Sequence, residues 1–256
     1  MQQGVLFVSK GIVHPSPAAR RRLRALLAEE AVPGLVTGEG AVGTASATPP
    51  PGAAGRNDAD LELPPFEVAS RLDRLLDLDP RTTATVVLFF HEKTPPDGAV
   101  EALAQYISNG GGLLAVHGAV ASFKRHTAYA ELIGGSFVGH DKPGPVLVYP
   151  AATERPGLRR GVADVTPIRL TDELYRVKVS GDVRVRYVGV SPGREEIVDE
   201  EPVCWERRHG GGRVAVVTLG HNAETFGVPA IRTLIAEELR RVAGVAGSMD
   251  LPGDER

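Results

Sequence analysis

The chain has 256 residues, of which 42% are hydrophobic and 24% are charged, and its formal net charge is −3. These values are typical of a globular protein, and the acidic balance argues against nucleic acid or an anionic membrane as the main partner. The single cysteine, Cys204, excludes an internal disulfide and a cysteine-based zinc site. The first residues carry no signal-peptide pattern, and no apolar run reaches membrane-spanning length, so we expect a cytoplasmic protein.

The first half of the chain alternates apolar runs with amphipathic segments. Continuous apolar runs, typical of buried parallel strands, cover residues 4–9, 84–90 and 113–116, and a short candidate strand covers 35–37. Helices are predicted to begin at Ser16 and Pro17, after Pro64 and Pro65, and after a capping residue, Asp97. The second of these helices would bury on one face Val68, Leu72, Leu75 and Leu76. This alternation predicts an α/β fold in which a mostly parallel sheet has helices on both faces.

The second half of the chain is richer in strands. We expect a short helix at 129–133, strands at 145–149 and 183–190, and a β-hairpin that joins 203–207 to 214–219 around three glycines. A final helix begins near Pro229. Residues 38–57, rich in glycine, alanine, threonine and proline, are expected to form a flexible insertion. We therefore predict one domain over residues 1–246, with an added β-hairpin region, and a tail at 247–256.

The stretch GGGLLAVHGAVASF is the centre of the predicted site. It is typical of a buried strand that stops and turns sharply at His117, and ligands of open α/β sheets bind at the carboxyl ends of strands. His14, His140 and His221 also follow apolar segments, and Glu173 lies in the acidic segment TDELY. Imidazoles beside a carboxylate suit a divalent metal such as zinc, and they also suit acid–base chemistry near neutral pH.

Each of these histidines also has a plain structural interpretation, as a hydrogen-bonded residue at a strand end, and spacing alone does not decide between the two. The sequence has no P-loop, no GxGxxG turn between a strand and a helix, no HExxH and no GxSxG, so we expect no nucleotide cofactor. Tyr175 and Trp205 are candidate aromatic surfaces for a sugar, although a core position is favoured for Trp205. Cys204 is expected to serve packing.

Four segments, in this order, carry a resemblance to a known family. They are GGGLLAVHGAVASF, TAYAELIGGSFVGH, TDELY and EPVCWERRHGGGRVAVVTLGHNAETF, and the opening VLFVSKGIVH adds a first strand with its histidine loop. With these segments the sequence resembles the ThuA-like family, named for trehalose utilisation. The resemblance covers nearly the whole chain and is densest from Glu101 to Phe226.

The resemblance implies a flavodoxin-like three-layer sandwich, similar to the fold of class I glutamine amidotransferases. In those enzymes the turn after the central strand carries a cysteine nucleophile. His117 stands there in this sequence, so cysteine-based amide transfer is not expected. The family is tied to the handling of disaccharides and their keto derivatives. Its motifs mark as pocket residues His14, His117, His140, Glu173 and His221. Two features depart from the family pattern, the insertion at 38–57 and the pair His91-Glu92 after its strand.

We therefore expect a metal-assisted enzyme that processes a glucoside, a disaccharide or a keto-sugar. In this hypothesis His140 and His221, with His117 or Glu173, hold a divalent metal such as zinc, and Glu173 or His117 moves protons. Substrate contacts are expected from His14, Ser122, Tyr175 and Trp205. Two alternatives stay open: a non-catalytic sugar-binding or regulatory module on a degenerate amidotransferase scaffold, and a hydrolase that uses Ser122 with His117. A homo-oligomer is compatible with the sequence.

Overall fold

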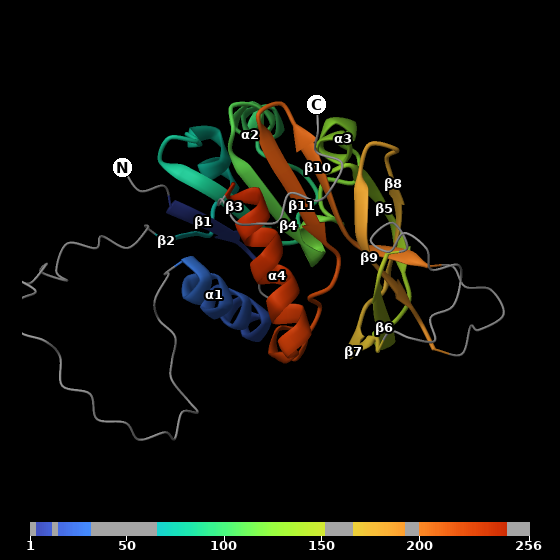
Figure 1. Ribbon diagram of the computed structural model, residues 1–256. Helices are drawn as coiled ribbons and strands as arrows, with labels where there is room; N and C mark the ends of the chain where they lie inside the picture. Colours follow the sequence, from blue (N-terminus) through green and yellow to red (C-terminus); the bar gives the residue numbers. More distant parts are fainter. Residues whose placement is uncertain (1–3, 12–14, 32–65, 152–165, 193–199, 245–256) are drawn as a thin grey trace, which may run out of the picture.

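The computed structural model describes residues 4–11, 15–31, 66–151, 166–192 and 200–244 (Figure 1). The expected short strand at 35–37, the insertion at 38–57, the tail at 247–256 and His14 lie outside the described residues. Within the described ranges, no helix is long and apolar enough to span a bilayer.

A nine-stranded sheet runs through the centre of the molecule, in the order β2-β1-β3-β4-β11-β10-β9-β6-β7. Its first five strands are parallel to one another: β2 (Phe66–Ala69), β1 (Gly4–Ser9), β3 (Thr83–Phe89), β4 (Gly112–Val116) and β11 (Gly212–Val217). Every residue of β1 and β4 is buried, as expected for strands that are covered on both faces. The carboxyl ends of these five strands share one edge of the sheet, where His117 follows β4.

The remaining strands are antiparallel, so the sheet is mixed and the expectation of a mostly parallel sheet is wrong. They are β10 (Glu201–His209), β9 (Arg184–Val190), β6 (Gly144–Pro150) and β7 (Ile168–Asp172). The predicted hairpin is confirmed by the pairing of β10 with β11. A connection of two residues joins only antiparallel neighbours, so the strand direction reverses at β10, and β9, β6 and β7 continue the antiparallel pairing. A separate small sheet pairs β5 (Gly135–His140) with β8 (Tyr175–Val179).

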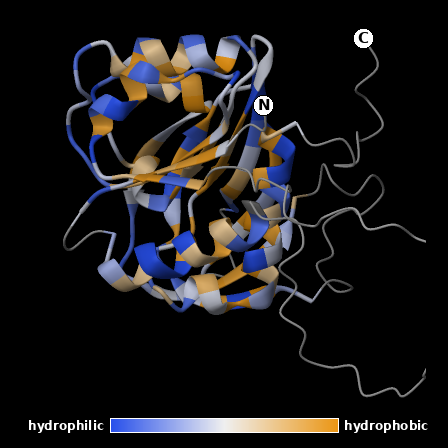
Figure 2. Ribbon diagram, turned by 90° about the vertical axis from the view of Figure 1, so that its left-hand side faces the viewer, coloured by the Kyte–Doolittle hydropathy of each residue, from blue (hydrophilic) through white to orange (hydrophobic). Residues whose placement is uncertain are grey.

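Helices cover both faces of the parallel part of the sheet (Figure 1). One face is covered by α1 (Pro17–Ala31) and α4 (Pro229–Val242). The other is covered by α2 (Ala99–Ser108), α3 (Thr127–Ile133) and the 3-10 helix η2 (Leu72–Asp77). Adjacent residues of β1, Leu6 and Phe7, belong to the buried clusters of opposite faces, as the alternation of a strand requires. Figure 2 shows the apolar strands between the two layers of helices.

The sequence predicts a capping residue for α1 and for α2, and the structure confirms one of the two. Ser16 caps α1 as expected, because its Oγ accepts a hydrogen bond from the Ala19 amide at 3.2 Å. Asp97 is not the capping residue of α2. That position is held by Gly98, whose φ of 75° lies in the left-handed region that glycine adopts without a steric penalty.

The segment after Pro65 is a strand followed by a 3-10 helix, not the continuous helix that its apolar spacing predicts. Residues 66–69 form β2, in which Val68 lies opposite Phe7 of β1, and Val68 is 44% exposed. Leu72 and Leu75 are still buried, from η2. Pairing with the edge of the sheet overrides the weak helical preference of such a short apolar stripe.

Candidate functional site

The turn after β4 holds His117 in a strained backbone conformation. His117 has a φ of 46°, and Phe123 is the other non-glycine residue of the described ranges with a positive φ. A left-handed φ costs a residue with a side chain about 1–2 kcal/mol. The turn packs closely against the segment that follows β3. A Cβ added to Gly118 would lie only 2.7 Å from the Phe90 carbonyl oxygen. Backbone strain of this kind is concentrated at functional sites, so the His117 turn is a candidate functional site.

The His117 ring is fully buried, and its two nitrogens have different partners. Nδ1 lies 2.8 Å from the Thr218 carbonyl oxygen, which can only accept, so Nδ1 carries the proton of the neutral ring. Nε2 then carries the ring's lone pair. It lies 3.2 Å from the Tyr175 hydroxyl, which donates to it, and 3.7 Å from Glu173 Oε2. The bond to Thr218 therefore orients a lone pair of His117 toward Glu173.

Glu173 lies among three histidines. Its Oε2 is 3.2 Å from His221 Nδ1 as well as 3.7 Å from His117 Nε2, and its Oε1 is 3.5 Å from His140 Nδ1. These residues come from different parts of the chain: Glu173 follows β7, His117 follows β4, His221 lies after β11 and His140 ends β5. The fold therefore gathers three imidazoles around one buried carboxylate.

Three of these residues, His117, Glu173 and His221, could hold a metal ion. Each offers one ligand atom, and these atoms lie within 4.8 Å of one another. Two ligand atoms bound to one ion at about 2.1 Å lie at most about 4.2 Å apart, and both contacts from Glu173 Oε2 fall in that range. Two imidazoles with a carboxylate suit zinc and other first-row divalent metals. His140 stands at the outer side of this group, with Nδ1 donating to the Asp141 carbonyl oxygen at 2.8 Å.

Asp172 holds the loop of His221 against the end of β7. Its buried carboxylate accepts hydrogen bonds from the amides of Glu173 at 2.7 Å, Gly220 at 2.9 Å and His221 at 3.0 Å, and from Thr225 Oγ1 at 2.6 Å. Burial raises the pKa of Asp172, and the four donors act in the opposite direction. In the sequence, Asp172 is the acidic residue directly before Glu173 in the segment TDELY, and it was not selected as a site residue. An acidic residue at the end of a strand, directly before Glu173, is the signal for its role.

Tyr175 forms the inner wall of the cluster. Its ring centroid lies 4.7 Å from that of His117, 4.8 Å from that of Phe137 and 5.6 Å from that of His140. Burial raises the pKa of Tyr175, and the charges of Glu173 and Asp172 raise it further, so the phenol stays protonated and can donate to His117. Because Tyr175 is buried, it is a hydrogen-bond partner of His117 and not the open aromatic surface for a sugar that the sequence suggests.

A sequence model of one family, described as trehalose utilisation, matches residues 5–240. The chain belongs to the ThuA family. Its fold is similar to two solved ThuA-like proteins. One, from Bacteroides uniformis, gives a TM-score of 0.61 at 17% identity, with 91% of this chain and 89% of that chain covered. The other, from Parabacteroides merdae, gives 0.65 at 15% identity, with 95% and 90% covered. No curated protein matches the sequence.

The family's relation to class I glutamine amidotransferases is consistent with the fold of this ThuA protein. Where those enzymes are expected to carry a cysteine nucleophile, the strained turn carries His117. The single thiol, Cys204, is buried within β10, where desolvation raises its pKa well above the ordinary value. The turn of this ThuA protein therefore offers an imidazole and no thiolate. Of the family's marked residues, the structure brings together four: His117, His140, Glu173 and His221.

Two residues that the sequence analysis assigns to the substrate lie elsewhere in this ThuA protein. Ser122 is buried, its Oγ donates to the Gly118 carbonyl oxygen at 2.8 Å, and it accepts from the Glu92 amide at 2.9 Å. Trp205 is 0% exposed, and its Nε1 donates to the Ile133 carbonyl oxygen at 2.8 Å. The polar atoms of both side chains are hydrogen-bonded to backbone groups. The expectation that they contact the substrate is therefore wrong, and both have structural roles. The hydroxyl bonds of Ser122 also leave no support for a hydrolase that uses Ser122 with His117.

Proposed function

We propose that this ThuA protein is a metal-assisted enzyme of carbohydrate metabolism. Its substrate is a glucoside, a disaccharide or a keto-sugar, bound at the carboxyl edge of the parallel strands. The observation that carries the proposal is the position of Glu173, whose carboxylate contacts His117 and His221 at distances that suit two ligands of one ion. A divalent metal held by His117, Glu173 and His221 would polarise a sugar carbonyl or vicinal hydroxyls, or activate water.

The protein's own residues divide the remaining work. His117 is kept in one tautomer by Thr218, which presents Nε2 to the site. When no ion is bound, Tyr175 donates a hydrogen bond to that nitrogen, and a bound ion would take the same lone pair in place of the hydroxyl. Glu173 is the proton carrier, with its Oε1 close to His140. The His140 side chain is 40% exposed, so it links the buried carboxylate to solvent and can pass a proton outward.

A second candidate is a non-catalytic sugar-binding or regulatory module. Glu173 contacts both His221 and His140. If the two imidazoles are protonated, these ion pairs satisfy the Glu173 carboxylate without a metal, which favours this candidate. In that case the imidazoles and the carboxylate would serve as hydrogen-bonding groups for sugar hydroxyls. The two candidates differ in whether a metal is needed and whether a product is formed.

The deciding experiment combines metal analysis with activity. The purified protein would be assayed for bound divalent metals and tested on glucosides, disaccharides and keto-sugars, before and after EDTA treatment and after zinc is restored. We expect turnover that EDTA abolishes and zinc restores, and that is lost in His140→Ala and in His221→Ala. His209→Ala, on the β10–β11 hairpin, is the matched control. Absence of metal, with full function in both site variants, would exclude the metalloenzyme. Sugar binding without turnover, unaffected by EDTA, would establish the second candidate.

A further inference from the structure

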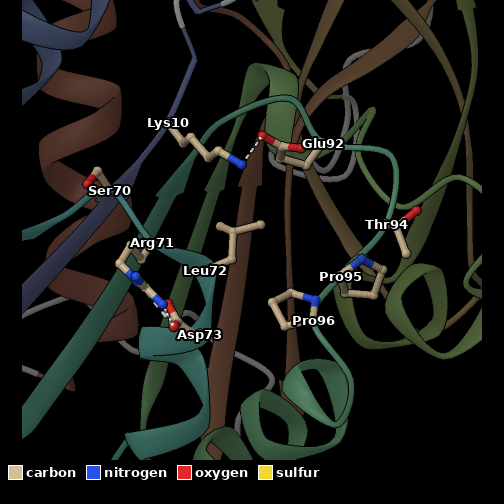
Figure 3. A pocket seen from close by; sticks show the side chains of 9 residues that line it. All are labelled: Lys10, Ser70, Arg71, Leu72, Asp73, Glu92, Thr94, Pro95 and Pro96. Atoms are coloured by element: carbon tan, nitrogen blue, oxygen red, sulfur yellow. Dashed lines mark hydrogen bonds and ion pairs between the residues drawn. The ribbon is translucent and has the colours of Figure 1, made fainter.

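A hollow of about 500 Å³ lies at the same edge of the sheet as the histidine cluster, at the carboxyl ends of β2, β1 and β3 (Figure 3). Lys10 directly follows β1, Ser70 directly follows β2, and Glu92 belongs to the segment after β3. None of the residues that line this hollow belongs to the cluster of His117, Glu173 and His221. Its volume is in the range of about 300–1,000 Å³ that is usual for small-molecule sites.

The hollow occupies the topological switch point of the parallel strands. β1 lies between β2 and β3, and the chain leaves β1 toward α1 on one face of the sheet but leaves β3 toward α2 on the other. The described residues that line the hollow come from the segments directly after β1, β2 and β3, and ligands of open α/β sheets bind at the carboxyl ends of such strands. Lys10 after β1 and Glu92 after β3 form an ion pair there, with Nζ 2.8 Å from Oε1.

The charges around the hollow are balanced. Lys10 pairs with Glu92, and Arg71 pairs with Asp73, as the dashed lines of Figure 3 show. Each cation is therefore neutralised by a carboxylate of the same hollow, which leaves no net charge to recognise a phosphate or a carboxylate. These side chains are exposed to solvent to different degrees, so water screens the attraction within both pairs. They can exchange their mutual bonds for bonds to ligand hydroxyls at small cost.

The rest of the lining combines hydroxyl groups with apolar surface. Ser70 and Thr94 supply the hydroxyls, and Leu72, Pro95 and Pro96 supply the apolar part. In Figure 3, Leu72 lies between the two ion pairs, with Pro96 nearby. A pyranose has the matching chemistry, since its hydroxyls lie around a ring whose faces are C–H groups. We infer that this hollow is a second binding site, for an uncharged sugar unit, that does not require the histidine cluster or a metal.

Titration of the EDTA-treated full-length protein, followed by amide NMR shifts, tests this inference. The probes are glucose and methyl glucoside as neutral sugars, with glucose 6-phosphate and gluconate as charged comparators. We expect the neutral sugars to saturate with millimolar dissociation constants, to shift the amides of residues 70–72 and 92–94, and to bind His221→Ala equally well. Glu92→Gln removes the negative charge and one acceptor oxygen, Thr94→Val removes one hydroxyl, and each should weaken binding by about tenfold. Asp79→Asn, in the ion pair with Arg81 outside the hollow, is the control and should bind normally.

Each outcome bears on this site separately from the proposed enzyme, because metal is removed and the cluster variant is included. Stronger binding of the charged comparators would contradict the neutral-sugar assignment. Absence of saturable shifts with all four probes, or unchanged affinity in both Glu92→Gln and Thr94→Val, would show that the hollow is not the site. If neutral-sugar binding disappears in His221→Ala, the sugar binds at the histidine cluster and the inference is wrong. A thermal melt of each variant identifies any loss of folding, and the conservative Thr94→Val is the variant that is least expected to unfold.

Discussion

Two buried carboxylates, Glu173 and Glu238, have neighbours of opposite chemical character. Glu173 is surrounded by imidazoles, whereas Oε1 of Glu238 in α4 lies 3.1 Å from Arg186 Nε and 3.8 Å from Arg241 Nε. A guanidinium is always protonated and has no lone pair to offer, so the Glu238 cluster cannot hold a metal ion. An imidazole can lose its proton and bind one. A buried carboxylate becomes a candidate metal ligand only when its neighbours also carry lone pairs.

The two clusters also differ in access to solvent. The side chains of Glu238 and Arg186 are 0% and 6% exposed, whereas His140 and His221 are 40% and 25% exposed. The Glu238 cluster therefore joins α4 to β9 in surroundings from which solvent is largely excluded. The Glu173 cluster can exchange protons and ligands with solvent through two of its histidines. This comparison assigns a structural role to Glu238 and a functional role to Glu173, and each assignment can be tested.

The largest effect is expected from the loss of a metal ligand. His221→Ala removes one of three ligand atoms, and we expect zinc affinity, measured by calorimetry, to fall by more than about 100-fold, which is the upper limit for loss of an outer hydrogen-bond partner. His209→Ala removes a histidine of the β10–β11 hairpin and should leave the affinity unchanged. Equal zinc affinity in the two variants would place the metal elsewhere.

The second effect concerns pH and belongs to the Glu238 cluster. Burial, opposed by Arg186, raises the pKa of Glu238 to about 7, above its value of 4.5 when unfolded. A raised carboxyl pKa means that the folded protein binds the proton more tightly. The stability from this group is therefore fully present below pH 4.5 and is lost as the pH rises through 7. Between about pH 5 and pH 8 we expect the free energy of unfolding to decrease by about 2–3 kcal/mol.

Urea unfolding of the wild type and of Glu238→Gln across this range measures the slope. The glutamine amide does not titrate, so the free energy of unfolding of the variant should no longer decrease with pH. This holds even if the absolute stability changes because Arg186 has lost its carboxylate partner. An equally steep slope in Glu238→Gln would show that other groups cause the pH dependence. The same series on Glu173→Gln should retain the Glu238 contribution, which separates the two clusters.

A third effect tests the residue that positions His221. The amide of Gly220 donates to Oδ2 of Asp172 and that of His221 donates to Oδ1, so Asp172→Asn, which replaces one of the two oxygens with an NH₂ group, removes the acceptor of one of these amides and loosens the loop of His221. We expect zinc affinity to fall by about 10–100-fold. Thr225→Val removes a single donor to Asp172 and should have a smaller effect. Zinc affinity in Asp172→Asn equal to that of the wild type would mean that Asp172 serves stability alone.

The different success of sequence reasoning for these residues has a physical reason. His117, His221 and Glu173 each follow a strand of the nine-stranded sheet, and strand ends meet at an edge of the sheet, so the local pattern was enough to select them as candidates for one site. His140 ends β5 of the separate small sheet, so the pattern alone did not determine that it would meet them. The strand after Pro65 and the antiparallel pairing of β10, β9, β6 and β7 depend on partners that are distant in sequence. Local periodicity contains no information about those partners, and it places Phe66–Ala69 in a helix.

Hydroxyl and indole groups show the same limit. The residue types of Ser122 and Trp205 permit contact with a sugar, but backbone acceptors, identifiable only in three dimensions, already use their polar atoms. Asp172 is the converse case. Its position directly before Glu173 is a sequence signal, but its role depends on amides 48 and 49 residues away, which the sequence does not identify. Candidate residues can thus be proposed from the sequence, but the hydrogen-bond partner of each polar atom can be identified only in the structure.

The smallest effect distinguishes support of the His117 turn from support of the metal ligands. Ser122→Ala leaves the Glu92 amide and the Gly118 carbonyl oxygen without the hydroxyl, at a cost of about 1–3 kcal/mol in the free energy of unfolding. The His117 ring is held separately by Thr218, so zinc affinity should change by less than about twofold. Urea unfolding and zinc calorimetry on the same variant measure both quantities. A loss of zinc affinity as large as that of Asp172→Asn would show that the strained turn and the metal ligands form one coupled unit, and the division between a structural and a functional cluster would then have to include the turn.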